Sequence, residues 1–233
     1  MKNWIKEALI VGVALIVSAV IMHNVLAQFV NKERVVYVKG LAEREVKADY
    51  VTWPLVYTQV GNDMRVMYAQ VKLKNKEIVD FLVDGGIQKS DIYISTPSFE
   101  DRDANRYSNN KSPYRYFGTS VITVSTSEVD KVIKLMQQQE KLLVKGILIK
   151  TDNYQYKPSF SYKGLNKIKP QMIEEATKNA RQSAEKFAKD SNSALGKIKT
   201  ANQGQFSIRS LDDNTEYIKK IRVVSSVTYY LKN

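Results

Sequence analysis

The sequence predicts an α+β protein: a two-layer, antiparallel-rich sheet with helices packed on one side, preceded by an N-terminal transmembrane or signal helix. Three observations lead to this prediction. Segments that alternate apolar and polar residues, as half-buried strands do, follow one another mostly as hairpins. Other segments between them repeat their apolar residues at the spacing of an amphipathic helix. The chain also starts with a long apolar run.

The apolar run follows a short basic start, Met1–Glu7, and extends from Ala8 to Met22. A cleaved signal peptide has an apolar core of about 7–15 residues, whereas an uncleaved signal anchor needs about 17–25. Counting on to Val30 gives enough length for an anchor, and the cleavage candidate at Asn24–Ala27 is a poor one. We therefore expect residues 1–30 to be a signal anchor, with a cleaved signal peptide as the alternative.

Both interpretations export the rest of the chain. An anchor, with Lys2 and Lys6 holding the N-terminus in the cytoplasm, would place the folded part in the periplasm at the inner membrane. Cleavage would instead release a soluble periplasmic protein. Residues 31–233 are long enough to bury a core, and we expect one domain there, or one domain of two lobes. Cysteine is absent, so no disulfide supports it.

The first folded elements are two strands and a helix. Residues 34–39 and 44–60 predict strands on either side of Gly40, and Pro54 places the second strand at an edge or a bulge. Asn62 is the expected cap of the helix, which Gly85–Gly86 ends. The buried face of the second strand is expected to carry Val51, Trp53, Leu55 and Tyr57. The apolar side of the helix is expected to carry Met64, Met67, Tyr68, Val71, Ile78, Phe81 and Leu82.

The middle of the chain predicts a long hairpin with arms 91–99 and 114–125. Residues 127–130 resemble a capping box for a second helix, whose sheet-facing side is Val129, Val132, Ile133 and Met136. A further strand is expected from Leu143 to about Thr151, with a continuation as far as Tyr162.

The last helix carries a stripe of alanines. Its expected inward face is Ile173, Ala176, Ala180, Ala184 and Phe187, a spacing of three and four residues. Such small side chains allow a close approach to a sheet, and Pro170 is expected in the first turn. Two strands then follow, 198–210 and 217–231, with a turn at 211–214.

Three stretches resemble the SIMPL-domain family, whose members are typically exported by bacteria. They are the alanine helix with Leu195–Ile198, the segment Val36–Glu43 followed by Val46–Asp49, and the final Ile221–Tyr230. Their order and spacing cover nearly all of the chain after residue 33. The resemblance implies the α+β fold, export and homo-oligomers. The family has no established catalytic residues to carry over.

Composition excludes several classes of site. The only histidine is His23, in the export segment, and cysteine is absent. This excludes Ser-His-Asp and Cys-His nucleophilic sites and Cys/His zinc sites from the folded part. No phosphate-binding or dinucleotide fingerprint occurs. We expect no enzyme, no cofactor and no dedicated metal site. Two acidic groups could bind calcium but lack the spacing of a calcium loop: Asp101 with Asp103, and Asp212 with Asp213 and Glu216.

One segment interleaves arginine and tyrosine with asparagine and serine. Its candidate interface or ligand-binding residues are Arg102, Arg106, Tyr107, Lys111, Tyr114, Arg115 and Tyr116. Such residues form protein interfaces, capture anionic groups, or pack on their own strands at a hairpin tip. A second group, Tyr154, Tyr156 and Tyr162, is open to the same interpretations.

The chain is basic. Its formal charge is +12, of which residues 1–30 hold +1, so the exported part carries +11. A basic protein binds nucleic acid or anionic surfaces, or is simply soluble, and export makes nucleic acid the least plausible partner. We therefore expect a non-enzymatic cell-envelope protein that acts by self-assembly and partner binding. The alternative is a binding protein for an anionic envelope component that uses the Arg/Tyr hairpin.

Overall fold

The computed structural model describes residues 2–30, 34–104, 113–151 and 154–232 and has an α+β fold with antiparallel sheets. The helices are α1 (Lys2–Val30), α2 (Met64–Asp84), α3 (Val129–Gln137), α4 (Glu140–Val144) and α5 (Leu165–Asp190). The strands are β1 (Val35–Lys47), β2 (Tyr50–Gly61), β3 (Ile92–Ile94), β4 (Ser98–Asp101), β5 (Tyr116–Thr126), β6 (Ser159–Ser161), β7 (Ala194–Gln203), β8 (Ser207–Ser210) and β9 (Ile218–Lys232). Short 3₁₀ turns cover Lys89–Asp91, Arg102–Ala104 and Tyr154–Tyr156.

The chain divides into two compact units. Unit 1 comprises residues 1–42, 173–205 and 223–233, and unit 2 comprises residues 43–172 and 206–222. One sheet has the order β1-β9-β7, with β8 also paired to β9, and the other has the order β3-β5-β2-β6, with β4 also paired to β5. The boundary between the units therefore falls inside β1, β9 and α5.

The N-terminal residues form the single helix α1. Its described side chains are apolar on all sides, and the exposed ones include Leu9, Val13, Leu15, Ile16 and Val20. Within the described part of the chain, no helix combines the length and hydropathy that crossing a membrane requires.

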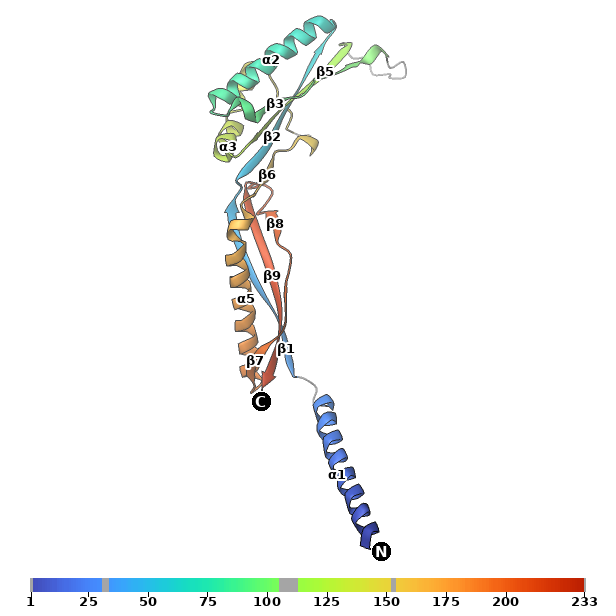
Figure 1. Ribbon diagram of the computed structural model, residues 1–233. Helices are drawn as coiled ribbons and strands as arrows, with labels where there is room; N and C mark the ends of the chain where they lie inside the picture. The colour runs from blue at the N-terminus through green and yellow to red at the C-terminus, as the bar shows by residue number, and fades with distance from the viewer. Residues whose placement is uncertain (1, 31–33, 105–112, 152–153, 233) are drawn as a thin grey trace. The chain divides into compact units, whose positions relative to one another are not determined.

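In unit 1, α5 lies against β1 and β9 through the alanine stripe (Figure 1). Ala180 and Ala184 pack with Val38 of β1 and with Val227 and Tyr229 of β9. The fully buried positions of α5 are Met172, Ala176, Ala180, Ala184 and Ala188. The expected stripe is thus confirmed at its three central alanines.

The two ends of the expected stripe are wrong. Phe187 is 60% exposed and Ile173 only partly buried, whereas Met172 and Ala188 take the inward positions. The reason is steric, because the helix axis lies too close to the sheet for a phenylalanine ring at that end.

Gly40 is the point of closest approach between α5 and β1. A Cβ atom built on Gly40 would lie 1.9 Å from the carbonyl oxygen of Ala176 and 2.3 Å from the amide nitrogen of Ala180. Beside it, the side-chain amide of Asn179 donates to the carbonyl of Leu41 at 2.8 Å. The expected turn at Gly40 is therefore wrong: β1 runs straight through, and this glycine admits a helix backbone instead.

The chain turns at Ala48–Asp49, between β1 and β2. The Asp49 carboxylate accepts hydrogen bonds from the amides of Lys163 at 2.7 Å and Gly164 at 2.9 Å, just before α5. These bonds lie just before α5, which begins at Leu165, so Pro170 lies in the second turn rather than in the expected first turn.

Unit 2 is built on β2 and β5, which pair over Val51–Gly61. The predicted alternation is confirmed, since Val51, Trp53, Leu55 and Tyr57 are all buried. They pack against Ile78, Phe81 and Leu82 of α2, Val129, Val132 and Leu135 of α3, and Leu142 of α4. Figure 1 shows these helices on one face of the sheet.

The edge expected at Pro54 is also confirmed. On the side away from β5, β2 pairs with β6 only at Tyr50–Thr52, and its next bond is from the Lys150 amide to the Val56 carbonyl at 2.7 Å. Pro54 lies between these contacts, so its missing N–H costs no ladder bond.

Several local expectations need correction. The cap of α2 is Asp63, whose carboxylate accepts from the amides of Arg65 and Val66, rather than Asn62. Residues 127–130 form no capping box, because the Glu128 side chain makes no cap bond; the Glu128 amide donates instead to the Thr126 hydroxyl at 3.2 Å. The end of α2 at Gly85–Gly86 is confirmed, with Gly86 at φ +86°.

Two expected strands also differ. Residues 143–151 contain the end of α4 and a single bridge between Ile149 and Tyr57 rather than a strand. The strand expected at 198–210 is divided into β7 and β8, because the Gly204 amide turns to donate to the Val224 carbonyl at 2.8 Å. The predicted turn at 211–214 is present, closed by the Asp212 carboxylate, which accepts from the amides of Asn214 and Thr215.

Candidate functional site

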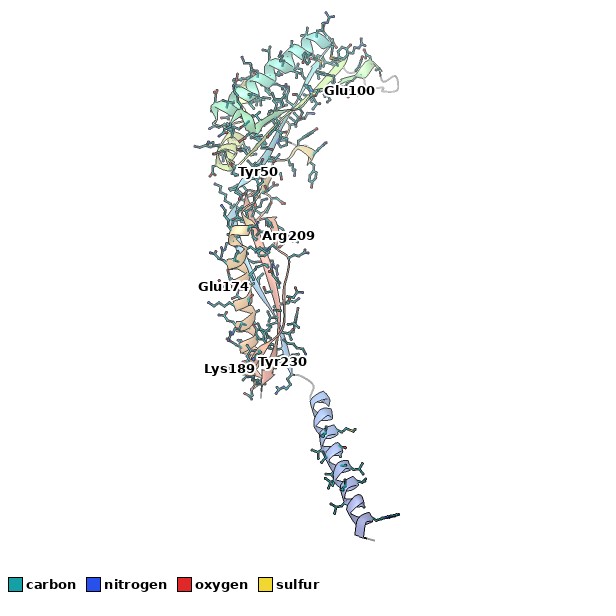
Figure 2. All side chains as sticks on the ribbon, in the orientation of Figure 1. Tyr50, Glu100, Glu174, Lys189, Arg209 and Tyr230 are labelled. Carbon is teal, nitrogen blue, oxygen red and sulfur yellow. The ribbon has the colours of Figure 1, made fainter. Side chains whose placement is uncertain are left out.

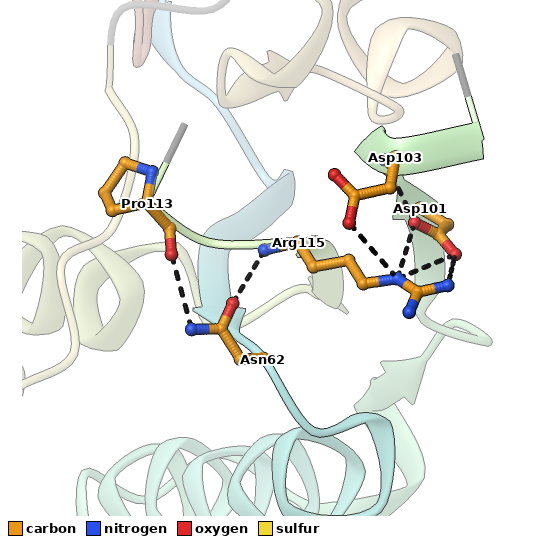
Figure 3. A network of polar contacts seen from close by, with 5 residues as sticks. All are labelled: Asn62, Asp101, Asp103, Pro113 and Arg115. Carbon is orange, nitrogen blue, oxygen red and sulfur yellow. Dashed lines mark hydrogen bonds and ion pairs between the residues drawn. The ribbon is translucent and has the colours of Figure 1, made fainter. Parts of the chain in front are cut away.

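The base of the Arg/Tyr hairpin is held by one arginine. Arg115 precedes β5, and its guanidinium donates to both carboxylate oxygens of Asp101, from Nε to Oδ1 at 3.1 Å and from Nη2 to Oδ2 at 2.8 Å. The Asp103 carboxylate lies 3.7 Å from the same Nε. The arms also meet through their backbone, where the Arg102 amide donates to the Arg115 carbonyl at 2.9 Å. Figure 3 shows the resulting cluster.

Asn62 links this cluster to the end of β2. Its side-chain oxygen accepts from the Arg115 amide at 2.8 Å, and its side-chain nitrogen donates to the Pro113 carbonyl at 3.3 Å (Figure 3). The side chain expected to cap α2 therefore holds the returning arm of the hairpin instead.

The charges of this cluster stabilise one another. The hydrogen bond from Arg115 is the main reason why the pKa of Asp101 lies below its usual value, helped by the amide of Asp103 and by the positive charge of Arg115. The same bond raises the pKa of Arg115 above its ordinary value. Arg115 is therefore already paired with a carboxylate, and its geometry fits a structural role better than anion capture.

The other predicted residues of the hairpin have different surroundings. The Arg102 guanidinium carbon lies 4.2 Å from the centre of the Phe117 ring, and that of Arg115 lies 5.0 Å from the centre of the Tyr116 ring. Tyr114 is 44% exposed. The structure thus brings Arg102, Arg115 and Tyr116 together at the start of β5. The remaining predicted residues, Arg106, Tyr107 and Lys111, lie outside the described residues.

The acidic groups considered for calcium have other contacts. Asp101 and Asp103 face Arg115, and Asp212 closes its turn through Asn214 and Thr215. Among the described residues, no group of three or more His, Cys, Asp or Glu side chains could hold a metal ion. In the second tyrosine group, Tyr154 is 86% exposed, with the Lys157 ammonium 5.4 Å from its ring centre.

The structure also assembles a basic hollow that the sequence analysis missed. It has a volume of about 340 Å³ and lies in unit 2, between β8, β9 and the last part of β1. Arg209 of β8 is directly opposite Lys220 of β9, and Arg222 lies two residues further along (Figure 2 labels Arg209). Glu43 partly offsets these charges, at 2.9 Å from Lys220 and 3.7 Å from Arg222.

Such a hollow has the chemistry of an anion site. It combines three cations with one carboxylate and adds the hydroxyls of Ser207 and Ser210. Nearby, Lys219 is buried and its ammonium donates to the Ser210 hydroxyl at 2.9 Å; burial lowers its pKa. The register of β8 on β9 brings these residues together. The sequence could have indicated it only if Gly204 had been recognised as the point where one strand ends and a second strand begins.

Comparison with known proteins agrees with this architecture. A family model described as SIMPL, a protein of unknown function (DUF541), matches residues 36–227. The chain belongs to the SIMPL family. The resemblance seen in the sequence is therefore confirmed over both units. A search of the curated proteins finds no match for this SIMPL chain.

In unit 1, α5 covers one face of the sheet, and in the part of the chain that the structure describes no helix packs on the other face. Val38 and Tyr229 point toward α5, so their strand neighbours point away from it. On this second face of β1, Val35 is 41%, Tyr37 59% and Leu41 39% exposed. On β9, Tyr230, labelled in Figure 2, lies near the start of β1, since the amide of the next residue, Leu231, donates to the Arg34 carbonyl at 2.8 Å; the Lys199 ammonium is 5.4 Å from the Tyr230 ring centre. We call the set of Val35, Tyr37, Leu41 and Tyr230 the open face.

The Asp101–Arg115 pair predicts how this SIMPL protein responds to acid. Because the pKa of Asp101 is lowered in the folded state, its contribution to stability is fully present above its unfolded pKa of about 4. That contribution is lost as the pH falls through the lowered value. Denaturant melts across this range should therefore show a wild-type advantage over Asp101→Asn that is constant above about pH 4 and shrinks below it.

The control for this prediction is the same comparison in an Arg115→Ala background. There the advantage of Asp101 and its pH dependence should both disappear. An advantage that persists without Arg115 would contradict the assignment of Arg115 as the cause.

Proposed function

We propose that this SIMPL protein is a non-enzymatic cell-envelope protein that acts by self-assembly and by binding a protein partner. The observation that carries this proposal is the open face of unit 1. One face of an antiparallel sheet often contacts water, but that face is then mostly polar. Here, valine, tyrosine and leucine recur along β1, and Tyr230 lies near the start of this strand. Exposed apolar and aromatic side chains that lie together are typical of protein interfaces.

The edge position of β1 supports self-assembly. In the order β1-β9-β7, which covers the described residues, β1 has a neighbouring strand on one side only. Its outer backbone groups are therefore open to pairing with another chain. A two-fold axis perpendicular to the sheet at this edge would bring β1 of one copy antiparallel to β1 of the next, with the open faces side by side.

The net positive charge opposes this assembly, since copies of one basic chain repel one another. Assembly therefore depends mainly on apolar contact across the open face, which added salt does not weaken.

The apolar character of α1 supports export. Its basic start and its apolar residues, Ala8–Met22, have the order of a signal sequence. We propose that α1 anchors the protein in the inner membrane and that the folded units lie in the periplasm. The alternative is cleavage and release as a soluble periplasmic protein.

Fractionation of expressing cells under an alkaline wash tests the location. The anchored form should remain in the membrane pellet at full length, because alkali strips only peripherally bound proteins. A soluble periplasmic form with a mature N-terminus near Gln28 would contradict the anchor and support the cleaved alternative.

Light scattering of the full chain in mild detergent tests the assembly. The wild type should exceed the monomer mass, and Tyr37→Ser with Leu41→Ser should lower the mass because it removes exposed apolar area from the open face. A matched control is Tyr154→Ser with Leu143→Ser, which removes similar exposed side chains from unit 2. A monomeric wild type, or equal effects of the two double variants, would contradict the proposal.

The second candidate function is the binding of an anionic envelope component. The basic hollow at Arg209, Lys220 and Arg222 favours it more than the Arg/Tyr hairpin does, because Arg115 is already paired with Asp101. Ionic strength separates the two functions. Capture by charge weakens steeply as salt is added, whereas assembly through the open face depends mainly on apolar contact.

A further inference from the structure

A groove in unit 2 lies between α2 and the edge of the five-stranded sheet. Its volume is about 490 Å³, and Val71 and Val79 of α2 face Ile94 of β3 and Pro97 across it. This volume lies within the range of ligand-binding clefts, roughly 300–1,000 Å³. Neither the open face nor the basic hollow includes any of these residues.

The wall formed by β3 offers backbone groups at a sheet edge. β3 is the outermost strand in the order β3-β5-β2-β6, and among the described residues it pairs with β5 alone. Just after β3, the Ser95 amide donates to the Val121 carbonyl of β5 at 3.0 Å. Because the direction of backbone groups alternates along a strand, the N–H and C=O of Ile94 point away from β5, toward the open edge. A peptide chain could pair with them.

The floor of the groove contains a side-chain donor. Asn75 of α2 is 8% exposed, and its oxygen accepts two hydroxyl hydrogen bonds, from Tyr57 at 2.7 Å and from Ser120 at 2.9 Å. Burial raises the pKa of Tyr57 to about 12, so this hydroxyl keeps its proton and remains a donor. The Tyr57 proton also has the Val71 carbonyl at 3.0 Å as an acceptor, the Asn75 oxygen faces both hydroxyls, and the described residues show no hydrogen bond from the Asn75 amide nitrogen. An incoming carbonyl would satisfy it.

The rim of the groove is basic. Lys72 and Lys76 lie one turn apart on α2, and Lys89 lies on the other side, against a single carboxylate, Asp80. No ion pair of these lysines occurs within the described parts of the chain. A ligand with several carboxylates would complement this rim.

We propose that the groove binds an extended acidic peptide segment of a partner protein, which adds to the sheet as a strand beside Ile94. Only the side chains of such a segment that face α2 would enter the groove, where apolar ones would contact Val71 and Val79 and carboxylates would meet the lysines of its rim. The free backbone of β3 favours a peptide over a small anionic molecule, because only a peptide can continue the ladder. The site is separate from the open face, so it stands or falls independently of the proposed assembly.

Fluorescence polarisation with the full chain in mild detergent tests the proposal. The probes are short labelled peptides of the repeat Glu-Thr-Val-Thr, in which glutamate and valine share one face of the strand, the same peptide with lysine for glutamate, and the glutamate peptide with alternate backbone nitrogens methylated. The first should bind saturably, and the other two should not. Equal binding of the glutamate and lysine peptides, or undiminished binding of the methylated one, would overturn the proposal.

Two charge-reversal pairs locate the site. Lys72→Glu with Lys76→Glu should weaken binding of the glutamate peptide by about tenfold or more. Lys186→Glu with Lys189→Glu makes the same charge change on the exposed face of α5 and should have a far smaller effect (Figure 2 labels Lys189). Equal losses of peptide affinity in the two double variants would mean that only net charge matters, and this result would overturn the proposed site.

Amide hydrogen exchange reports the strand pairing itself. The Ile94 amide should exchange more slowly when the glutamate peptide is bound, because it then donates to the peptide backbone. Unchanged exchange at Ile94 with the peptide bound would overturn strand addition.

Discussion

The closest approach of α5 to β1 determines the rest of unit 1. Helix and strand can meet here only because Gly40 has no side chain and because Ala176, Ala180 and Ala184 present methyl groups to the sheet. A Cβ on Gly40 would overlap the helix backbone, so the contact is made by main-chain atoms. Main-chain atoms cannot move aside as a flexible side chain can, so these contacts fix the rotation of α5 about its axis.

The same contact determines which surfaces remain for function. With α5 held against Val38 and Tyr229, the alternate residues of β1 and β9 face away from the helix, and the open face follows from strand geometry. In unit 2 the helices again cover a single face of the sheet, and within the described residues no strand pairs with the outer edge of β3. Each unit therefore offers a surface that combines apolar side chains with a free strand edge, which suits a protein that acts through contacts.

The sequence predicted what depends on local periodicity. The alternation of β2, the central alanines of α5 and the glycines after α2 agree with the structure, and the expected hairpin is present with its first arm divided into β3 and β4. It failed where packing decides between similar residues. Phe187 is more apolar than Ala188, yet the close approach excludes it, and the apolar run at 143–151 could be a strand or a helix by pattern alone. The pairing of Arg115 with Asp101, the basic hollow and the groove depend on strand register and on distances between elements, which one sequence does not contain.

Urea unfolding of the Gly40→Ala variant tests the central claim most directly. A methyl group at this position must push α5 away from β1, so the variant should lose roughly 1–3 kcal/mol of unfolding free energy. Lys39→Ala, at the exposed neighbouring position of the same strand, should change it by less than about 0.5 kcal/mol. Equal midpoints for Gly40→Ala and Lys39→Ala would contradict the claim that the backbone contact at Gly40 holds α5 on the sheet.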